Sequence, residues 1–295
     1  MAIKECELYE KEKNGKVKCL ACSHRCIISE GKTGICGVRK NIGGKLFLLV
    51  YGRVAAEHVD QIEKKPFYRF LPGTKAFSIG TVGCNFKCDW CQNFDISQVS
   101  KKNGKEEGII FGEEKTAQEI VNEALESGCE SIAYTYNEPA IWSEYVKDIA
   151  TLARKNKIRN VLVTNGYFTK EALQYLDGLI DAANVDIKSF NDKTYKKFCG
   201  AKLQPVLDCI KLMHKKGIHV ELTTLVIPGI NDSEKELKAI ANWIARLDKN
   251  IPWHISRFFP MYKMKDREIT PKLTLERDYE IGKKAGLKFV YVGNI

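Results

Sequence analysis

The chain has 295 residues, of which 44% are hydrophobic and 28% charged, and its formal net charge is +10. This length allows one large domain, or a large domain with a small partner. No apolar run approaches the ~20 residues that span a membrane, and the charged start MAIKECELYEKEKNG lacks a signal peptide's apolar core, so we expect a cytoplasmic protein. Lysines and glutamates are interleaved without a long basic tract, which predicts a solvated surface and neither nucleic acid nor membrane as partner.

Residues 1–72 are predicted to form a small cysteine-rich module with a linker. Its glycine-rich stretch CLACSHRCIISEGKTGICG holds four cysteines, namely Cys19, Cys22, Cys26 and Cys36. Grouped cysteines in a reducing compartment indicate metal ligation, and zinc is favoured over a second iron–sulfur cluster. His24 is close enough to replace one ligand, and four reduced cysteines without metal are the alternative. A strand pair around GKLFLLVYGRVAAEHV and the proline-containing linker IEKKPFYRFLPG, lying against the next domain, follow.

Residues 73–295 alternate short β-branched runs with amphipathic helical stretches. Thr116 with Glu119 and Ser233 with Glu236 fit the capping box that starts a helix. The apolar runs are typical of buried strands, and they are KAFSIGTVG, SIAYTYN, NVLVTN, AANVDIK, HVELTTLVIPG, PWHISRF and KFVYVG. Seven strands alternating with helices predict an α/β fold with a parallel sheet, which is either open and doubly wound or curled into a partial or full barrel.

Polar residues follow the carboxyl end of every predicted strand. They are the cysteines after the first strand, then YNEP, TNG, DIK and PGIND, then His254 and Arg257, and finally GN. Barrel-type α/β proteins build their active sites at these ends, so we expect one cavity to collect the polar groups.

Three cysteines, Cys84, Cys88 and Cys91, lie within TVGCNFKCDWCQN after the first of these strands. A structural zinc site requires four ligands, whereas a [4Fe-4S] cluster held at three corners leaves one iron free for a reacting ligand. The C-x3-C-x2-C spacing, with Trp90 before the last cysteine, resembles the radical S-adenosylmethionine (SAM) superfamily. The resemblance implies a partial or full (β/α) barrel in which the free iron binds the amino and carboxylate groups of SAM. It also implies reductive cleavage to a 5′-deoxyadenosyl radical that abstracts hydrogen.

The segments YNEP, TNGY and VDIKSF are similar to those of pyruvate formate-lyase activating enzymes. The residues that this resemblance places near SAM, together with Trp90, are Asn137, Glu138, Thr164, Asn165, Asp186 and Lys188. Those activating enzymes have an acidic residue before TNG that helps to hold a monovalent cation. Here the position is Val163, so that cation site is not expected although Asp186 is present.

The loop after the fifth strand and the sixth strand add further candidates. Asn231 and the backbone of PGIND would approach adenosine, and Val226 would pack against adenine; the alternative is an ordinary capped helix start. His254 is predicted either to contact the SAM carboxylate or the substrate, or to be structural. With Lys188 it is a candidate catalytic residue, and so is Arg257, whose planar guanidinium suits a substrate carboxylate or phosphate.

The N-terminal cysteine stretch, IEKKPFYRFLPG, HISRFFPMYKM and YVGN together resemble the radical SAM enzyme of the AmmeMemoRadiSam system. Members of that anaerobic family often continue past YVGN with a cysteine-containing tail. The sequence stops at Ile295, so such a tail is either absent or was removed. We expect hydrogen abstraction from a small molecule, such as a polyol or a phosphorylated metabolite, with ferredoxin or flavodoxin as electron donor. The alternatives are an activase acting on a glycine of a partner protein and a non-catalytic metal scaffold for Memo-like and AMME-like proteins.

Overall fold

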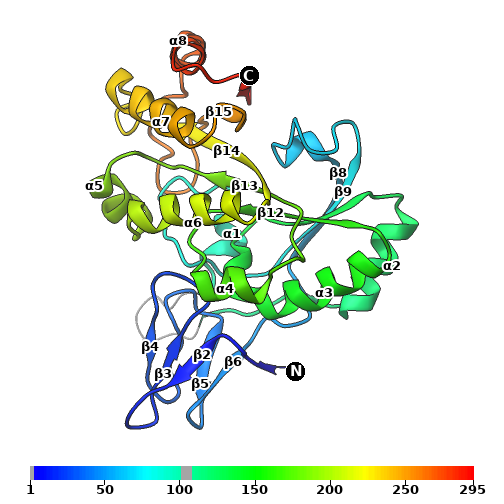
Figure 1. Ribbon diagram of the computed structural model, residues 1–295. Helices are drawn as coiled ribbons and strands as arrows, with labels where there is room; N and C mark the ends of the chain where they lie inside the picture. Colours follow the sequence, from blue (N-terminus) through cyan, green and yellow to red (C-terminus); the bar gives the residue numbers. More distant parts are fainter. Residues whose placement is uncertain (1–2, 101–107) are drawn as a thin grey trace.

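The computed structural model of the protein describes residues 3–100 and 108–295, and its centre is one large sheet. Within these residues the sheet has eight strands in the order β16-β15-β14-β13-β12-β11-β9-β8, all parallel except β8, which pairs antiparallel with β9. The strands are β8 (Ala56–Gln61), β9 (Lys75–Gly80), β11 (Ser131–Tyr134), β12 (Arg159–Thr164), β13 (Ala182–Asp186), β14 (His219–Val226), β15 (Trp253–Arg257) and β16 (Val290–Gly293). Because β8 and β16 are its two edges, the curved sheet is a partial barrel (Figure 1).

Helices connect the parallel strands, as the sequence predicts. They are α1 (Phe94–Ser97), α2 (Ala117–Glu126), α3 (Ser143–Lys155), α4 (Lys170–Tyr175), α5 (Asp192–Thr194), α6 (Leu203–Lys215), α7 (Glu234–Leu247) and α8 (Lys272–Lys284), with the short turns η2 (Pro139–Trp142) and η3 (Tyr195–Cys199). The capping box of Thr116 and Glu119 is confirmed at α2. At α7, Ser233 accepts from the backbone N–H of Glu236, whereas the Glu236 carboxylate accepts from Ser189 instead of closing the predicted box.

The N-terminal part forms two small antiparallel sheets, β1-β6-β5 and β2-β3-β4, at one end of the molecule (Figure 1). Their strands are β1 (Lys4–Glu5), β2 (Tyr9–Lys11), β3 (Val17–Cys19), β4 (Ile27–Ile28), β5 (Arg39–Ile42) and β6 (Lys45–Leu48). Of the four grouped cysteines, Cys19 ends β3 and the other three lie between strands. The expected pairing within GKLFLLVYGRVAAEHV is wrong, because β6 pairs with β5 and β1 while β8 joins the central sheet. The short strand β7 (Arg53–Val54), which lies between β6 and β8 in the sequence, pairs with β10 (Glu113–Glu114).

A buried ion pair joins the N-terminal sheets to the barrel. The guanidinium of Arg39 donates to both carboxylate oxygens of Glu144 on α3, and its Nε donates to the carbonyl of Ile141 at 2.7 Å. Both side chains of the pair are at most 1% exposed. One continuous hydrophobic cluster also includes residues of both parts, so the N-terminal sheets pack directly on the barrel.

Residues 62–74, which we call the strap, cross the inner face of the sheet. They begin with the turn η1 (Ile62–Lys64), and Ile62 and Phe67 are fully buried against small residues near the starts of the strands, such as Ala76 and Ala182. The carbonyl of Pro66 accepts from Asn184 of β13 at 2.8 Å. The predicted linker therefore lies inside the barrel, because small side chains leave room for it there.

Among the residues described, no helix is both long enough and apolar enough to cross a membrane.

Candidate active site

The three central cysteines lie on the loop that follows β9. Cys84 and Cys88 are buried and Cys91 is partly exposed. The backbone N–H of Phe86 donates to the Cys84 sulfur at 3.4 Å, and the sulfur of Cys91 lies 3.1 Å from the hydroxyl of Ser97. Contacts with its own backbone and with α1 thus shape the loop so that three thiols face inward.

Cys199, at the end of the π-helical turn η3, contacts this loop. Its carbonyl accepts from the backbone N–H of Lys87 at 2.8 Å, and its thiol hydrogen-bonds Cys88. That bond, together with burial, raises the pKa of Cys88 well above its usual value. Cys199 is completely buried, and no sequence pattern predicts that it lies beside Cys88.

The three cysteines line one cavity of 430 Å³ together with polar residues from the carboxyl ends of neighbouring strands. Predicted site residues in its wall, besides the cysteines, are Trp90, Asn137, Thr164, Asn165, Asp186 and Lys188. Residues that the sequence analysis did not single out also line it, among them Lys64, Lys65, Tyr136, Thr223 and Ser256. The cavity gathers the ends of β9, β11, β12, β13, β14 and β15, as the parallel arrangement requires.

The YNEP segment holds the cavity wall together. The side-chain amide of Asn137 donates to the hydroxyl of Thr81 and to the carbonyl of Gly83, both at 2.9 Å, which ties it to the cysteine loop. Glu138 is completely buried and accepts from the hydroxyl of Thr164 at 2.7 Å and from the backbone N–H of Asn165 at 2.8 Å. Burial raises the pKa of Glu138 to about 7, against the pull of these donors. Glu138 does not line the cavity and instead positions the two residues that do.

Lys188 and Asp186 form an ion pair in the cavity wall, with 2.9 Å between Nζ and Oδ2. The charges of Asp186 and of nearby thiols raise the Lys188 pKa well above its usual value, overcoming the effect of burial. Asn231, fully buried beyond the wall, donates from its amide to the carbonyls of Lys188 and Leu225, each at 2.8 Å. Its side chain therefore fixes two wall segments rather than facing the cavity.

Val226, His254 and Arg257 lie outside the residues that line the cavity. Val226 is fully buried, and the Nε of Arg257 donates to the carbonyl of Thr270 at 2.8 Å. His254 points toward the start of β14, where its Nε2 lies 2.6 Å from the carboxylate of Glu221. Side-chain alternation along β15 predicts on which face of the sheet each of His254 and Arg257 lies. It does not predict how near the cavity each of them is.

The donor set in this cavity fits an iron–sulfur cluster. A cluster binds each cysteine through a different iron, so its thiols need not converge on one point. No group of three or more His, Cys, Asp or Glu side chains in the described ranges is arranged around a single metal ion. Three inward thiols beside a 430 Å³ space that also exposes amide, carboxylate and ammonium groups suit a cluster with a polar nucleotide next to it.

The four N-terminal cysteines line one small cavity of about 10 Å³, together with His24 and Asn85. Burial raises the pKa of each of the four thiols. The Nδ2 donor of Asn85 is buried and has no hydrogen-bond partner in the described part of the chain. The oxygen of the same amide accepts from Asn165 at 2.8 Å, so Asn85 connects the four-cysteine cavity with the active-site wall. The four cysteines line one cavity, but in the described part of the chain they too are not arranged around a single metal ion, and zinc there stays a prediction.

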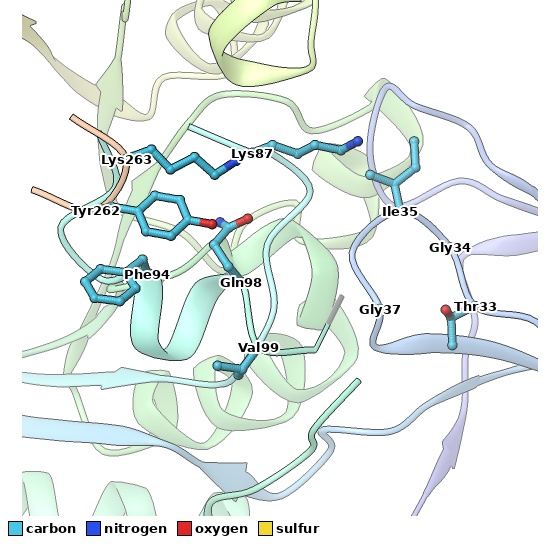
Figure 2. Close-up of a pocket in the computed structure, with 10 residues that line it drawn as sticks. All are labelled: Thr33, Gly34, Ile35, Gly37, Lys87, Phe94, Gln98, Val99, Tyr262 and Lys263. Atoms are coloured by element: carbon cyan, nitrogen blue, oxygen red, sulfur yellow. The ribbon is translucent and has the colours of Figure 1, made fainter. Parts of the chain in front are cut away.

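A further cavity of 530 Å³ lies beside the cysteine loop and α1. Figure 2 shows Phe94, Tyr262 and Lys263 on one side of it and residues 33–37 on the other. The rings of Phe94 and Tyr262 stack there with their centres 4.9 Å apart. The predicted site residues do not contribute to its lining, so it is separate from the candidate active site.

A partial parallel barrel with three cysteines at the end of its first strand defines a class of iron–sulfur enzymes. The sequence model of the Radical SAM superfamily matches residues 78–244, and the chain belongs to this superfamily of enzymes. The family implies a [4Fe-4S] cluster and SAM.

Several relatives support this assignment. The chain is 42% identical over 294 residues to the uncharacterized protein MJ0808 of Methanocaldococcus jannaschii, with 99% of this chain and 86% of that protein covered. It is 24% identical over 211 residues to the pyruvate formate-lyase-activating enzyme of Clostridium pasteurianum, covering 64% of this chain and 82% of the enzyme. Among solved structures, a radical SAM methyltransferase from Sphaerobacter thermophilus aligns with a TM-score of 0.54 and 17% identity, covering 76% of this chain and 67% of that one. At that identity the likeness shows the fold alone.

Proposed function

We propose that the protein binds a [4Fe-4S] cluster through Cys84, Cys88 and Cys91 and uses SAM to remove hydrogen from a small-molecule substrate. The observation that carries the proposal is the single cavity that these cysteines share with polar residues from the strand ends. When bound and reduced, the cluster supplies the electron that cleaves SAM to methionine and a 5′-deoxyadenosyl radical. Ferredoxin or flavodoxin is the proposed source of that electron.

The chain's own residues would bind SAM and keep its parts in place. Thr164, Asn165 and the Asp186–Lys188 pair present hydroxyl, amide and charged groups to the cavity, which suit the polar ends of SAM. Glu138 orients the first two through its hydrogen bonds. The wall also excludes water from the reacting groups. His254, Arg257 and Val226 are outside the lining, so no direct contact with SAM or substrate is proposed for them.

A small molecule is favoured over a protein segment because the strap residues Lys64, Lys65 and Pro66 form part of the cavity wall. The substrate would be a polyol or a phosphorylated metabolite that is rearranged or dehydrated. The second candidate is an activase that forms a glycyl radical on a partner protein. It is supported by relatives whose names state this activity, such as the pyruvate formate-lyase-activating enzymes, at 23% and 24% identity.

Zinc is the metal that we propose for the four N-terminal cysteines. Thiolates favour zinc, and closed four-ligand sites in small modules commonly hold it. Metal analysis of a variant with Cys84, Cys88 and Cys91 all changed to Ala tests this. We expect about one zinc per chain and little iron; iron with sulfide at this site would indicate a second cluster instead.

The proposed activity is tested anaerobically with the full chain, reconstituted with iron and sulfide. Wild-type protein with SAM and dithionite should form 5′-deoxyadenosine, detected by mass spectrometry, and Cys88→Ala should form none. Cys209→Ala is the matched control, because Cys209 is a buried thiol on α6 that does not line the cavity. A protein that contains the cluster but does not cleave SAM would contradict the proposal and favour the non-catalytic scaffold. A radical on an added partner protein, with no hydrogen taken from metabolites, would favour the activase.

A further inference from the structure

The strap contributes a basic edge to the active-site cavity. Lys64 and Lys65 both line the cavity, and neither belongs to residues 78–244, which the superfamily model covers. Residues within that span would serve the cluster and SAM, which all members share. A wall element outside the shared span is where a particular member can recognise its own substrate.

The two strap lysines share one carboxylate. Nζ of Lys65 lies 2.9 Å from one oxygen of Asp60, and Nζ of Lys64 lies 3.2 Å from the other. Lys64 is largely exposed, whereas the Lys65 side chain is only 7% exposed. Burial lowers the pKa of Lys65 even with Asp60 beside it, so its ammonium is incompletely stabilised where it lies.

Ammonium groups outnumber carboxylates in the cavity wall. The charged groups among the described lining residues are three lysines and the carboxylate of Asp186, which is paired with Lys188. With Asp60 behind the lysines, three ammonium groups face two carboxylates in this part of the wall. The count concerns the lysine and carboxylate groups alone, since the cysteines and the cluster they would hold carry their own charge. In a partly desolvated pocket an anion entering from solvent would be attracted to these ammonium groups.

Tyr136 places a hydroxyl beside Lys65, and this hydroxyl also lies 3.1 Å from Nδ1 of His58. The backbone of Tyr136 has φ of +67°, the left-handed region that a tyrosine rarely adopts. The carbonyl of Tyr136 accepts from Asn93 at 2.7 Å, and Gly80 allows the close approach, since a Cβ there would be 2.7 Å from the carbonyl of Thr135. Nζ of Lys65 lies 3.4 Å from the Tyr136 hydroxyl and 4.6 Å from the centre of its ring. The strained backbone therefore holds the ring and hydroxyl against the buried ammonium.

Resting on the function proposed above, we propose that the substrate is a small anion and that Lys65, with the hydroxyl of Tyr136, binds its anionic group. Phosphate and carboxylate share the chemistry that this pair would recognise, namely oxygen acceptors for an ammonium and an O–H donor. A neutral polyol would offer the Lys65 ammonium no charged partner besides Asp60. The strap thus determines the substrate class, while the superfamily portion provides the radical.

The test follows hydrogen from substrate into 5′-deoxyadenosine. The probe is a metabolite extract from cells grown in deuterated medium, divided by anion exchange into a retained and an unretained fraction. Reconstituted wild-type protein is incubated with each fraction, SAM and dithionite, and the deuterated share of the 5′-deoxyadenosine is measured by mass spectrometry. We expect deuterium from the retained fraction only. Loss of the transfer after alkaline phosphatase treatment would assign a phosphate, and survival would assign a carboxylate.

Variants connect this transfer to the strap. Lys65→Met should lower the deuterated share at least tenfold, and Lys65→Arg, which keeps the cation, should lower it less. Lys263→Met removes a lysine from the separate cavity of Figure 2 and should match wild type. Iron and sulfide content checks that each variant is folded and loaded.

Four results would overturn the inference. Two concern the wild-type protein: deuterium from the unretained fraction, and no transfer from either fraction although SAM is cleaved. Two concern Lys65→Met: a wild-type deuterated share, and a defect that excess SAM removes. The last result would assign Lys65 to SAM binding. Wild-type protein that carries the cluster but forms no 5′-deoxyadenosine refutes instead the function on which the inference rests.

Discussion

Replacing Glu221 with glutamine should release the strap from the barrel without unfolding the rest of the protein. Glu221 is completely buried on β14, and its two carboxylate oxygens accept the backbone N–H groups of Tyr68 and Arg69 at 3.1 and 2.8 Å. His219 and His254 bond the same carboxylate at 3.1 and 2.6 Å. One side chain therefore satisfies two strap amides and two histidines.

The size of the effect follows from these bonds. Hydrogen bonds to a charged group contribute about 1.5–3 kcal/mol each, and glutamine keeps one acceptor oxygen while turning an NH2 toward donors. We therefore expect strap opening to become easier by about 2–4 kcal/mol, which corresponds to a loss of amide protection of roughly 30- to 1000-fold. Burial alone would raise the pKa of Glu221. The hydrogen bonds with His219 and His254 outweigh burial, so that the pKa falls from 4.5 to about 2. The carboxylate's contribution is thus complete above about pH 4.5 and is lost as the pH falls toward 2.

Hydrogen exchange measured by mass spectrometry reports separately on the strap and on the helices of the barrel. Peptides covering residues 62–74 should lose protection in Glu221→Gln, while peptides from α7 should not. Glu30→Gln is the matched control, because Glu30 also accepts two backbone N–H groups, those of Gly43 and Gly44, on an exposed loop. Strap protection that falls less than threefold, or exchange that rises equally in α7, would refute the assignment of Glu221 as the anchor of the strap.

Three further predictions concern stability. Glu144→Gln should lower the free energy of unfolding by about 3–5 kcal/mol, because it leaves the Arg39 guanidinium buried without its charged partner. Denaturant titrations measure this, and the double variant Arg39→Met/Glu144→Leu should lose less stability than Glu144→Gln. Since the folded protein holds an extra proton on Glu138 between about pH 4.5 and 7, the unfolding free energy should fall as pH rises through that window, and Glu138→Gln should flatten the profile. Gly166→Ala should lower the melting temperature, since φ is +70° there and the added Cβ would lie 2.6 Å from Val185 Cγ1; a wild-type value would contradict this.

The parallel sheet and the position of the cysteine loop after its first parallel strand could be predicted because both depend on local sequence patterns. Each strand is a short apolar run, and the three cysteines lie within eight residues, so neighbouring residues carry the information. Which strands pair across long stretches of sequence was harder to predict. The residues of β8 were expected in the N-terminal module, yet β8 pairs with β9, since a strand pattern gives a face but no partner.

The candidate site shows the same division between local and distant information. Asn165 and Lys188 follow strands directly, and strand order alone brings them to the cavity. Lys65 reaches it only because small side chains such as Ala76 and Ala182 leave space for the strap, and Cys199 reaches Cys88 through a π-helical turn. A sequence pattern does not show where small residues on several strands together leave room for another segment. Residues that directly follow a strand are therefore the easier ones to predict, while those that enter the cavity from other parts of the chain, such as Lys65, require the three-dimensional packing.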